Sequence, residues 1–250
     1  METKSEPRHL DFLVKTQLAI EKIRIATQVR NSHLHLRGEN DPICGELQKR
    51  VQAVEDFVDE TVADTIKNHP AYDWFSQIKG VGKENIAKVI GLVDITRAPH
   101  VSSLWKFAGM HTQDGKAPKP EKGKKLDYNS TLRTMCWRLG SSLIRARGKF
   151  YEYYLKEKNK YQMRFRNQGY KIVPSDKLPK DKKGRKYEPK GILSEGHLDN
   201  MARRKMIKLF LSMLYVAWRS QLGLPVSSPF SIEHLGHDHV YKPKDFIENA

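Results

Sequence analysis

Cysteine, long apolar runs and strand-like alternation are all scarce in this sequence of 250 residues. Its two cysteines, Cys44 and Cys136, cannot build a disulfide framework, and neither belongs to a CxxC pair, so we expect two reduced, buried thiols. No stretch reaches the roughly 18 apolar residues that a membrane span needs. The polar first residues lack the apolar core of a signal peptide. These absences predict a cytoplasmic protein without a membrane partner.

The familiar cofactor and metal motifs are also missing. The sequence has no P-loop, no dinucleotide-binding fingerprint and no HExxH pair, so no cofactor is expected. His234, His237 and His239 have a spacing that could hold a metal ion, but no cysteine or second ligand pair accompanies them. We therefore expect an ordinary polar tail and no metal site.

What the sequence does have is positive charge, and it is concentrated in one segment. Of the net charge of +16, residues 1–110 contribute nothing, with 15 basic and 15 acidic side chains. Residues 111–190 carry 23 basic against 8 acidic side chains, a net +15, and residues 191–250 carry 7 against 6. A local excess of this kind predicts a polyanionic partner. The alternative is a solvated loop that only aids solubility.

Helical periodicity covers most of the chain and predicts a mainly α fold. Asp41 and Pro42 are typical of a helix start, with an N-cap residue followed by proline at the first helical position. Few residues separate the first two helices, which favours an antiparallel helical hairpin. No stretch shows convincing strand alternation. The expected helices cover residues 9–36, 42–67, 71–77, 84–92, 102–107, 129–147, 149–167 and 198–222.

These elements suggest three regions. An N-terminal helical hairpin spans residues 1–69, and self-association and packing onto the rest of the chain are both open to it. A helical domain spans 70–222, with a Pro/Gly/Lys loop at 111–127 and a mobile basic loop at 168–191. A tail covers 223–250. The expected core helix carries Arg203, Arg204, Lys205 and Lys208, which would contact either phosphate or acidic side chains. Aromatic and basic residues alternate in 151–170, which favours either base stacking or core packing.

The most informative segment surrounds Gly80-Val81-Gly82, and it is typical of a helix-hairpin-helix motif. Two glycines allow a sharp turn and a close approach of phosphate to the backbone. Free N–H groups at the start of the next helix then face the anion, helped by the helix dipole. Such a turn holds DNA backbone without reading base sequence; the alternative is a turn used only for packing. The expected phosphate contacts are Gly80, Val81, Gly82, Lys83 and Lys88, with longer-range attraction from Lys116, Lys119, Lys122, Lys124, Lys125 and Arg133.

The motif extends into a wider resemblance. The matching positions are Gly80, Gly82, Ala87, Gly91, Asp94-Ile95, Ala108-Gly109-Met110 and Tyr128-Asn129-Ser130-Thr131-Leu132-Arg133. Over residues 71–166, with a weaker echo in 198–222, the sequence resembles the C-terminal domain of bridge-RNA-guided insertion-sequence transposases. The resemblance implies a helical DNA-binding domain that acts in DNA transposition or recombination. It also raises a guide RNA as a further partner.

Two departures leave enzymatic activity open. The family's N-terminal RuvC-like domain, with its acidic metal ligands, has no counterpart in these residues. The family's catalytic serine precedes a glycine, whereas Thr112 stands near Gly115 here, and a secondary hydroxyl is a hindered nucleophile. Ser130, Ser141 and Ser142 carry no mark of a nucleophile. We therefore expect a relative that keeps DNA binding; the rivals are an active serine-dependent transposase working with a partner and a non-enzymatic RNA-binding or architectural protein.

Overall fold

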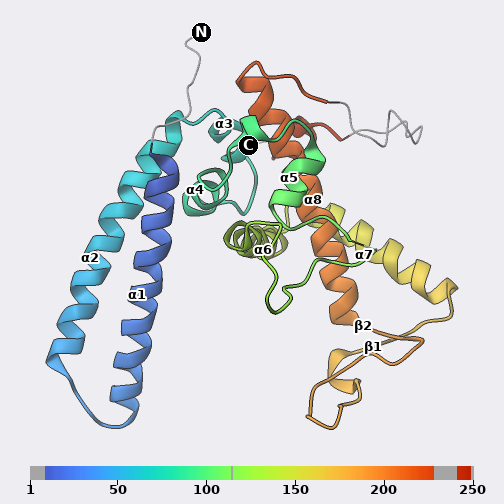
Figure 1. Ribbon diagram of the computed structural model, residues 1–250, viewed down its shortest axis with the longest axis horizontal. Helices are drawn as coiled ribbons and strands as arrows, with labels where there is room; N and C mark the ends of the chain where they lie inside the picture. Colours follow the sequence, from blue (N-terminus) through green and yellow to red (C-terminus); the bar gives the residue numbers. More distant parts are fainter. Residues whose placement is uncertain (1–8, 114, 228–240, 249–250) are drawn as a thin grey trace.

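The structure, a computed structural model, describes residues 9–113, 115–227 and 241–248 and confirms the mainly α prediction (Figure 1). Two short strands, β1 (Lys171–Val173) and β2 (Ile192–Ser194), are added to the helices. No helix in the described ranges combines the length and apolar character that a membrane crossing requires. The helices are α1 (Leu10–Leu36), α2 (Pro42–Thr65), α3 (Tyr72–Phe75), α4 (Lys83–Ile90), α5 (Val101–Phe107), α6 (Ser130–Ala146), α7 (Lys149–Asn167) and α8 (Glu195–Gln221).

Helices α1 and α2 form the predicted antiparallel hairpin, which stands to one side of the other helices in Figure 1. The side chain of Asp41 caps α2 by accepting hydrogen bonds from the backbone N–H groups of Ile43 and Cys44. A short 3-10 turn, Ile66–Asn68, continues α2 and leads into the body of the protein. The body consists of α3 to α8, with the last described residues, 241–248, packed on it.

Helix α8 is the central core helix that its apolar sequence predicted. It packs against α5, α6 and α7, and Phe210, Tyr215 and Trp218 on it are almost fully buried. Polar groups fix its position as well. The Arg219 guanidinium donates to the backbone oxygens of Ile95 and Ala98, both at 3.0 Å, and so ties α8 to the segment after α4. Cys44 and Cys136 are buried free thiols, as expected.

Residues 168–191 differ from the mobile, strand-free loop that their composition predicted. Strand β1 pairs in parallel with β2, with Lys171 opposite Ile192. Within the segment, Asp181 accepts hydrogen bonds from the backbone N–H groups of Lys183 and Arg185. Three-residue strands are too short to show alternation, and the carboxylates that organise the loop look like ordinary surface charges in the sequence. The lack of convincing strand alternation in the sequence therefore did not exclude these two short strands.

The C-terminal residues pack on the body. Phe246 is buried and stacks on Phe150 at 4.3 Å between ring centres. The Trp74 indole N–H donates to the backbone oxygen of Pro243 at 2.9 Å, which joins the last residues to α3. The histidines at 234, 237 and 239 lie outside the described residues. Among those that are described, no three His, Cys, Asp or Glu side chains gather as a metal site would require.

Candidate nucleic-acid interface

The Gly-Val-Gly segment forms a turn between α3 and α4, and its first glycine is required by packing. Helix α3 is a single turn, shorter than predicted. Ile78 is buried and Val81 is half-buried against the core, as the motif leads one to expect. Gly80 has a φ of +87°, and a Cβ there would overlap the side chain of Ala146 on α6. Any other residue at this position would push the turn off α6.

At Gly82, in contrast to Gly80, neither packing in the described ranges nor backbone conformation requires a glycine. Its φ and ψ of −84° and 163° suit any residue, and an added Cβ would meet nothing within 4 Å. It is the N-cap of α4, where no side chain caps the helix. Among the described residues, no acceptor binds the backbone N–H groups of Lys83, Glu84 and Asn85. These donors lie at the positive end of the helix dipole, and the side chains of Lys79 and Lys83, which are close to them in sequence, are exposed.

Lys88, one of the expected phosphate contacts, is placed elsewhere. Its side chain is buried, and its Nζ lies 3.0 Å from Glu21 of α1 and 3.5 Å from Glu84. A buried, paired ammonium cannot reach a phosphate without breaking its ion pair, so Lys88 is removed from the interface. The sequence hides this because Glu21 is 67 positions away. Lys88 instead attaches the N-terminal hairpin to the body.

The loop 111–127 carries the remaining expected lysines. Lys116, Lys119, Lys122, Lys124 and Lys125 are all exposed, and only Lys124 forms an ion pair among the described residues, with Glu121 at 2.6 Å. Arg133, on α6, contacts the loop through its guanidinium group. Its guanidinium donates to the backbone oxygen of Pro118 at 2.9 Å and lies over the Tyr128 ring, 4.9 Å from its centre. Arg133 therefore holds the loop on α6 while its charge adds to the field.

Helix α6 connects the turn at Gly80 with the loop 111–127. The turn at Gly80 contacts the backbone of Ser142 near the C-terminal end of the helix, and Arg133 lies near its N-terminal end. The C-terminal residues also reach the region of the turn. Glu248 accepts a hydrogen bond from the backbone N–H of Lys149, at the start of α7. Sequence patterns gave no sign of this contact, because tail and helix are 99 positions apart.

The aromatic residues of α7 are used mostly for packing. Tyr154 is buried, while Tyr151, Tyr153 and Tyr161 are half-buried against the core. Burial raises the pKa of Tyr153 well above its usual value. Of the two interpretations of this segment, the structure favours core packing over base stacking.

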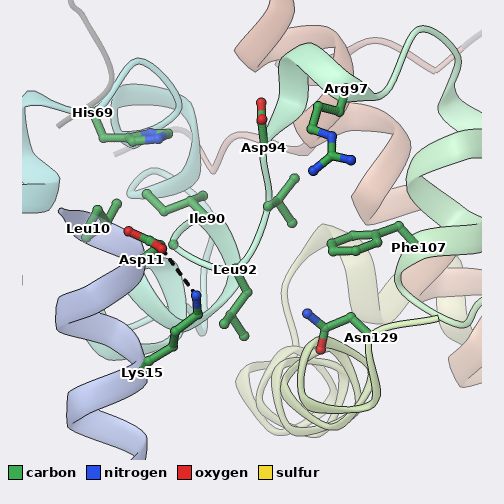
Figure 2. A pocket seen from close by; sticks show the side chains of 12 residues that line it. Leu10, Asp11, Lys15, His69, Ile90, Leu92, Asp94, Arg97, Phe107 and Asn129 are labelled. Atoms are coloured by element: carbon green, nitrogen blue, oxygen red, sulfur yellow. Dashed lines mark hydrogen bonds and ion pairs between the residues drawn. The ribbon is translucent and has the colours of Figure 1, made fainter. Parts of the chain in front are cut away.

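A cavity of about 470 Å³ lies where the hairpin meets the body (Figure 2). Asp11 and Lys15 of α1 pair at 3.2 Å on one side of it, and Asp94 and Arg97 line it from the segment after α4. Charges of both signs give this cavity no preference for an anion. None of the residues expected to bind DNA lines it.

The comparisons with known proteins add no relative to this picture. No protein-family model matches the chain, and no curated protein matches it. The resemblance to insertion-sequence transposases stays a prediction that rests on the motif residues.

Proposed function

We propose that this protein binds nucleic acid, with duplex DNA as its principal partner, through contacts to the phosphate backbone. The turn between Gly80 and Lys83 is the proposed contact, and the exposed lysines of loop 111–127 supply longer-range attraction. The resemblance in the motif residues supports a role for this binding in DNA transposition or recombination. Backbone contacts of this kind position a duplex without reading its sequence.

The observation that carries the proposal is the difference between the two glycines of the turn. Packing against α6 accounts for Gly80. Packing among the described residues does not account for Gly82, whose dihedral angles suit any residue and whose added Cβ would meet nothing within 4 Å. A bare backbone beside three free N–H groups and two exposed lysines is the arrangement that admits a phosphate group. A side chain at Gly82 would stand between the phosphate and these donors.

The proposal assigns binding and no catalytic step. Thr112, which stands where the resembled family has its serine region, is exposed, and in the described ranges its hydroxyl makes no hydrogen bond to a base. Ser141 donates to the backbone oxygen of Trp137 within its own helix. Among the described residues, neither hydroxyl contacts a base that could activate it as a nucleophile.

Salt-dependent binding tests the proposal. Affinity for a DNA duplex is measured at several salt concentrations for the wild type and for the variant that combines Gly82→Val with Lys83→Glu. Each lost phosphate contact lowers the slope of log affinity against log salt by about one. We expect steep salt dependence for the wild type, loss of most of the affinity in the variant, and unchanged folding, because valine suits the dihedral angles of Gly82.

A matched control combines Gly45→Val with Lys49→Glu on α2. A Cβ at Gly45 also meets nothing within 4 Å, and Lys49 is exposed, so the chemical changes are the same at a site distant in sequence from the turn. Equal binding by the turn variant and this control would overturn the role of the turn. A structured RNA serves as a parallel probe: tighter binding to it than to the duplex would instead support the RNA-binding alternative.

A further inference from the structure

Helix α8 carries a second group of cations that neither the turn nor the lysine loop includes. Arg203, Arg204, Lys205 and Lys208 lie on its first half, and Arg133 of α6 lies close enough to affect the pKa of Arg204. We call these five residues the α8 cluster. In the part of the chain that the structure describes, none of them forms an ion pair with a carboxylate.

The nearby acids have other partners. Asp199, one helical turn before Arg203, lies 2.6 Å from the Lys158 ammonium and accepts a hydrogen bond from the Tyr154 hydroxyl at 2.7 Å. Asp127, at the end of the lysine loop, lies 3.3 Å from the ring of His111. The sequence left open whether the patch on α8 pairs with acids, and the described structure contains no such pair.

Neutral groups hold the cluster in place. The Arg204 guanidinium donates to the backbone oxygens of Gly109 at 2.9 Å and His111 at 3.0 Å. Arg203 donates to the Ser141 hydroxyl at 3.3 Å. The Lys208 ammonium lies 4.0 Å from the centre of the Trp105 ring, whose N–H donates to the backbone oxygen of the same lysine. These contacts orient the cations without neutralising them.

Charges held in this way lower the stability of the free protein. The side-chain Nε atoms of Arg203 and Arg204 are buried and have no hydrogen-bond partner among the described residues. Burial, together with Lys205 and Arg204, lowers the pKa of Lys208 to about 8. Burial and then Arg133 lower the pKa of Arg204. A bound anion would relieve this repulsion, whereas no anionic side chain of the described residues does so.

We propose that the α8 cluster binds phosphate groups of a nucleic-acid backbone, as a second contact separate from the turn. This inference rests on the proposed function and extends the interface along α6. Arg204 and Arg133 also donate to backbone oxygens at the start of the lysine loop and within it, so the cluster adjoins the loop that carries the exposed lysines. This adjacency favours an extended polyanion over a small phosphate compound.

The length of α6 sets the spacing between the two contacts. From Arg133 to Ala146, which meets Gly80, the helix rises roughly 20 Å at 1.5 Å per residue. That distance corresponds to roughly six nucleotides along one strand of a duplex at 3.4 Å each. A duplex that spans both contacts should therefore bind more tightly than an oligonucleotide that reaches only one.

The test combines Lys205→Gln with Lys208→Met. Both changes leave the arginine tethers intact, and methionine keeps an apolar stem against Trp105. We expect a folded protein whose thermal stability equals or exceeds that of the wild type, because repulsion is removed. Its affinity for a spanning duplex should fall, with the salt slope reduced by about two. The matched control, Lys182→Gln with Lys183→Gln, changes two exposed lysines of residues 168–191 and should leave the slope near the wild-type value.

The possible outcomes distinguish a failure of the cluster proposal from a failure of the proposed function. If the cluster variant and its control bind alike while the change at Gly82 and Lys83 removes binding, the cluster proposal is overturned and the proposed function stands. If the wild type binds no nucleic acid, the proposed function itself fails. The indole N–H signal of Trp105 identifies the ligand: a shift with duplex at far lower phosphate concentration than with inorganic phosphate supports the cluster, and equal response to both overturns a nucleic-acid ligand.

Discussion

The N-terminal hairpin and the body of this protein are both helical, yet polar contacts have a larger share in holding the hairpin together. Beside buried valines such as Val14 and Val62, several polar contacts join α1 and α2: Gln17 donates to Asp59 at 2.6 Å, Asn31 donates to Gln48 at 2.9 Å, and Arg24 pairs with Glu55. The body is held by aromatic and aliphatic side chains around α8. Directional contacts fix the register of the two hairpin helices, while burial of apolar surface supplies most of the stability of the body.

Exposed apolar side chains are also distributed unevenly between the hairpin and the body. Of the fifteen exposed large apolar side chains in the described ranges, nine lie on the hairpin. These nine side chains are Phe12, Ile23, Ile25, Val29, Leu36, Ile43, Leu47, Val54 and Phe57. Self-association of the N-terminal helices stays a prediction, and this exposed apolar surface is where it would occur.

The largest expected effect is in the body, at Gly80. Valine there would need a positive φ, which costs about 1–2 kcal/mol, and would press on Ala146 and the backbone of Ser142, which adds about 1–3 kcal/mol. We expect Gly80→Val to lower the free energy of unfolding by roughly 4 kcal/mol, measured by urea denaturation. Gly82→Val is the control and should lower it by about 1 kcal/mol or less, from the loss of a favoured N-cap residue. Equal stability of the two variants would remove the packing explanation for Gly80.

The next effect is at the joint between the two regions, where His69 is buried against Trp218 with 4.6 Å between ring centres. Its Nδ1 accepts the backbone N–H of Ala71, and burial lowers its pKa from 6.5 to about 4. The unfolded chain therefore binds a proton below about pH 6.5 that the folded chain binds only near pH 4. Stability is lost as the pH falls through this window, by up to about 3 kcal/mol.

Comparison with His69→Gln isolates this contribution, because acid titration of the carboxylates affects both proteins. The variant should lose less free energy of unfolding than the wild type between about pH 7 and pH 4.5. Parallel loss in the two proteins would show that His69 does not titrate as its burial requires. The difference between the two proteins gives the share of the acid destabilisation that arises from His69, where the hairpin meets the body.

The third effect concerns the ionic link between the regions. Glu21 of α1 lies 3.0 Å from both Lys88 of α4 and Arg138 of α6. Burial alone would raise the pKa of Glu21, but hydrogen bonds from Arg138 and Lys88 outweigh it and leave the pKa below its usual value. Among the described residues, Glu21→Gln leaves the buried ammonium of Lys88 with Glu84 as its one remaining ion-pair partner. We expect a loss of about 2 kcal/mol in urea denaturation at neutral pH.

Glu60→Gln is the matched control, because Glu60 is exposed on α2 and should contribute little. If both variants lose the same amount, the Glu21 link does not stabilise the joint. The stabilisation by Glu21 should also disappear as the pH falls through its folded-state pKa, because a carboxylate with a lowered pKa stabilises the fold only while it is ionised.

Local patterns in the sequence predicted most of the fold and part of the site. Periodicity placed α1, α2, α6, α7 and α8 to within a few residues, and the Asp41 cap is read directly from the sequence because capping is a local interaction. What the sequence could not show depends on distant partners. The burial of Lys88 requires Glu21, and the orientation of Arg204 requires Gly109, which is 95 positions earlier. The same holds for the docking of residues 241–248 and for the pairing of β1 with β2.

The smallest expected effect concerns the polar contacts between α1 and α2. Asn31 and Gln48 are partly buried partners, so changing both to leucine replaces one hydrogen bond by apolar contact. Removing both members of such a pair is nearly neutral or stabilising, whereas removing one leaves the other unsatisfied. We expect the double variant to gain about 1 kcal/mol in free energy of unfolding and Asn31→Leu alone to lose about 1 kcal/mol. A double variant that is less stable than the wild type would show that polar contacts supply stability to the hairpin as well as register, and the contrast with the body would then disappear.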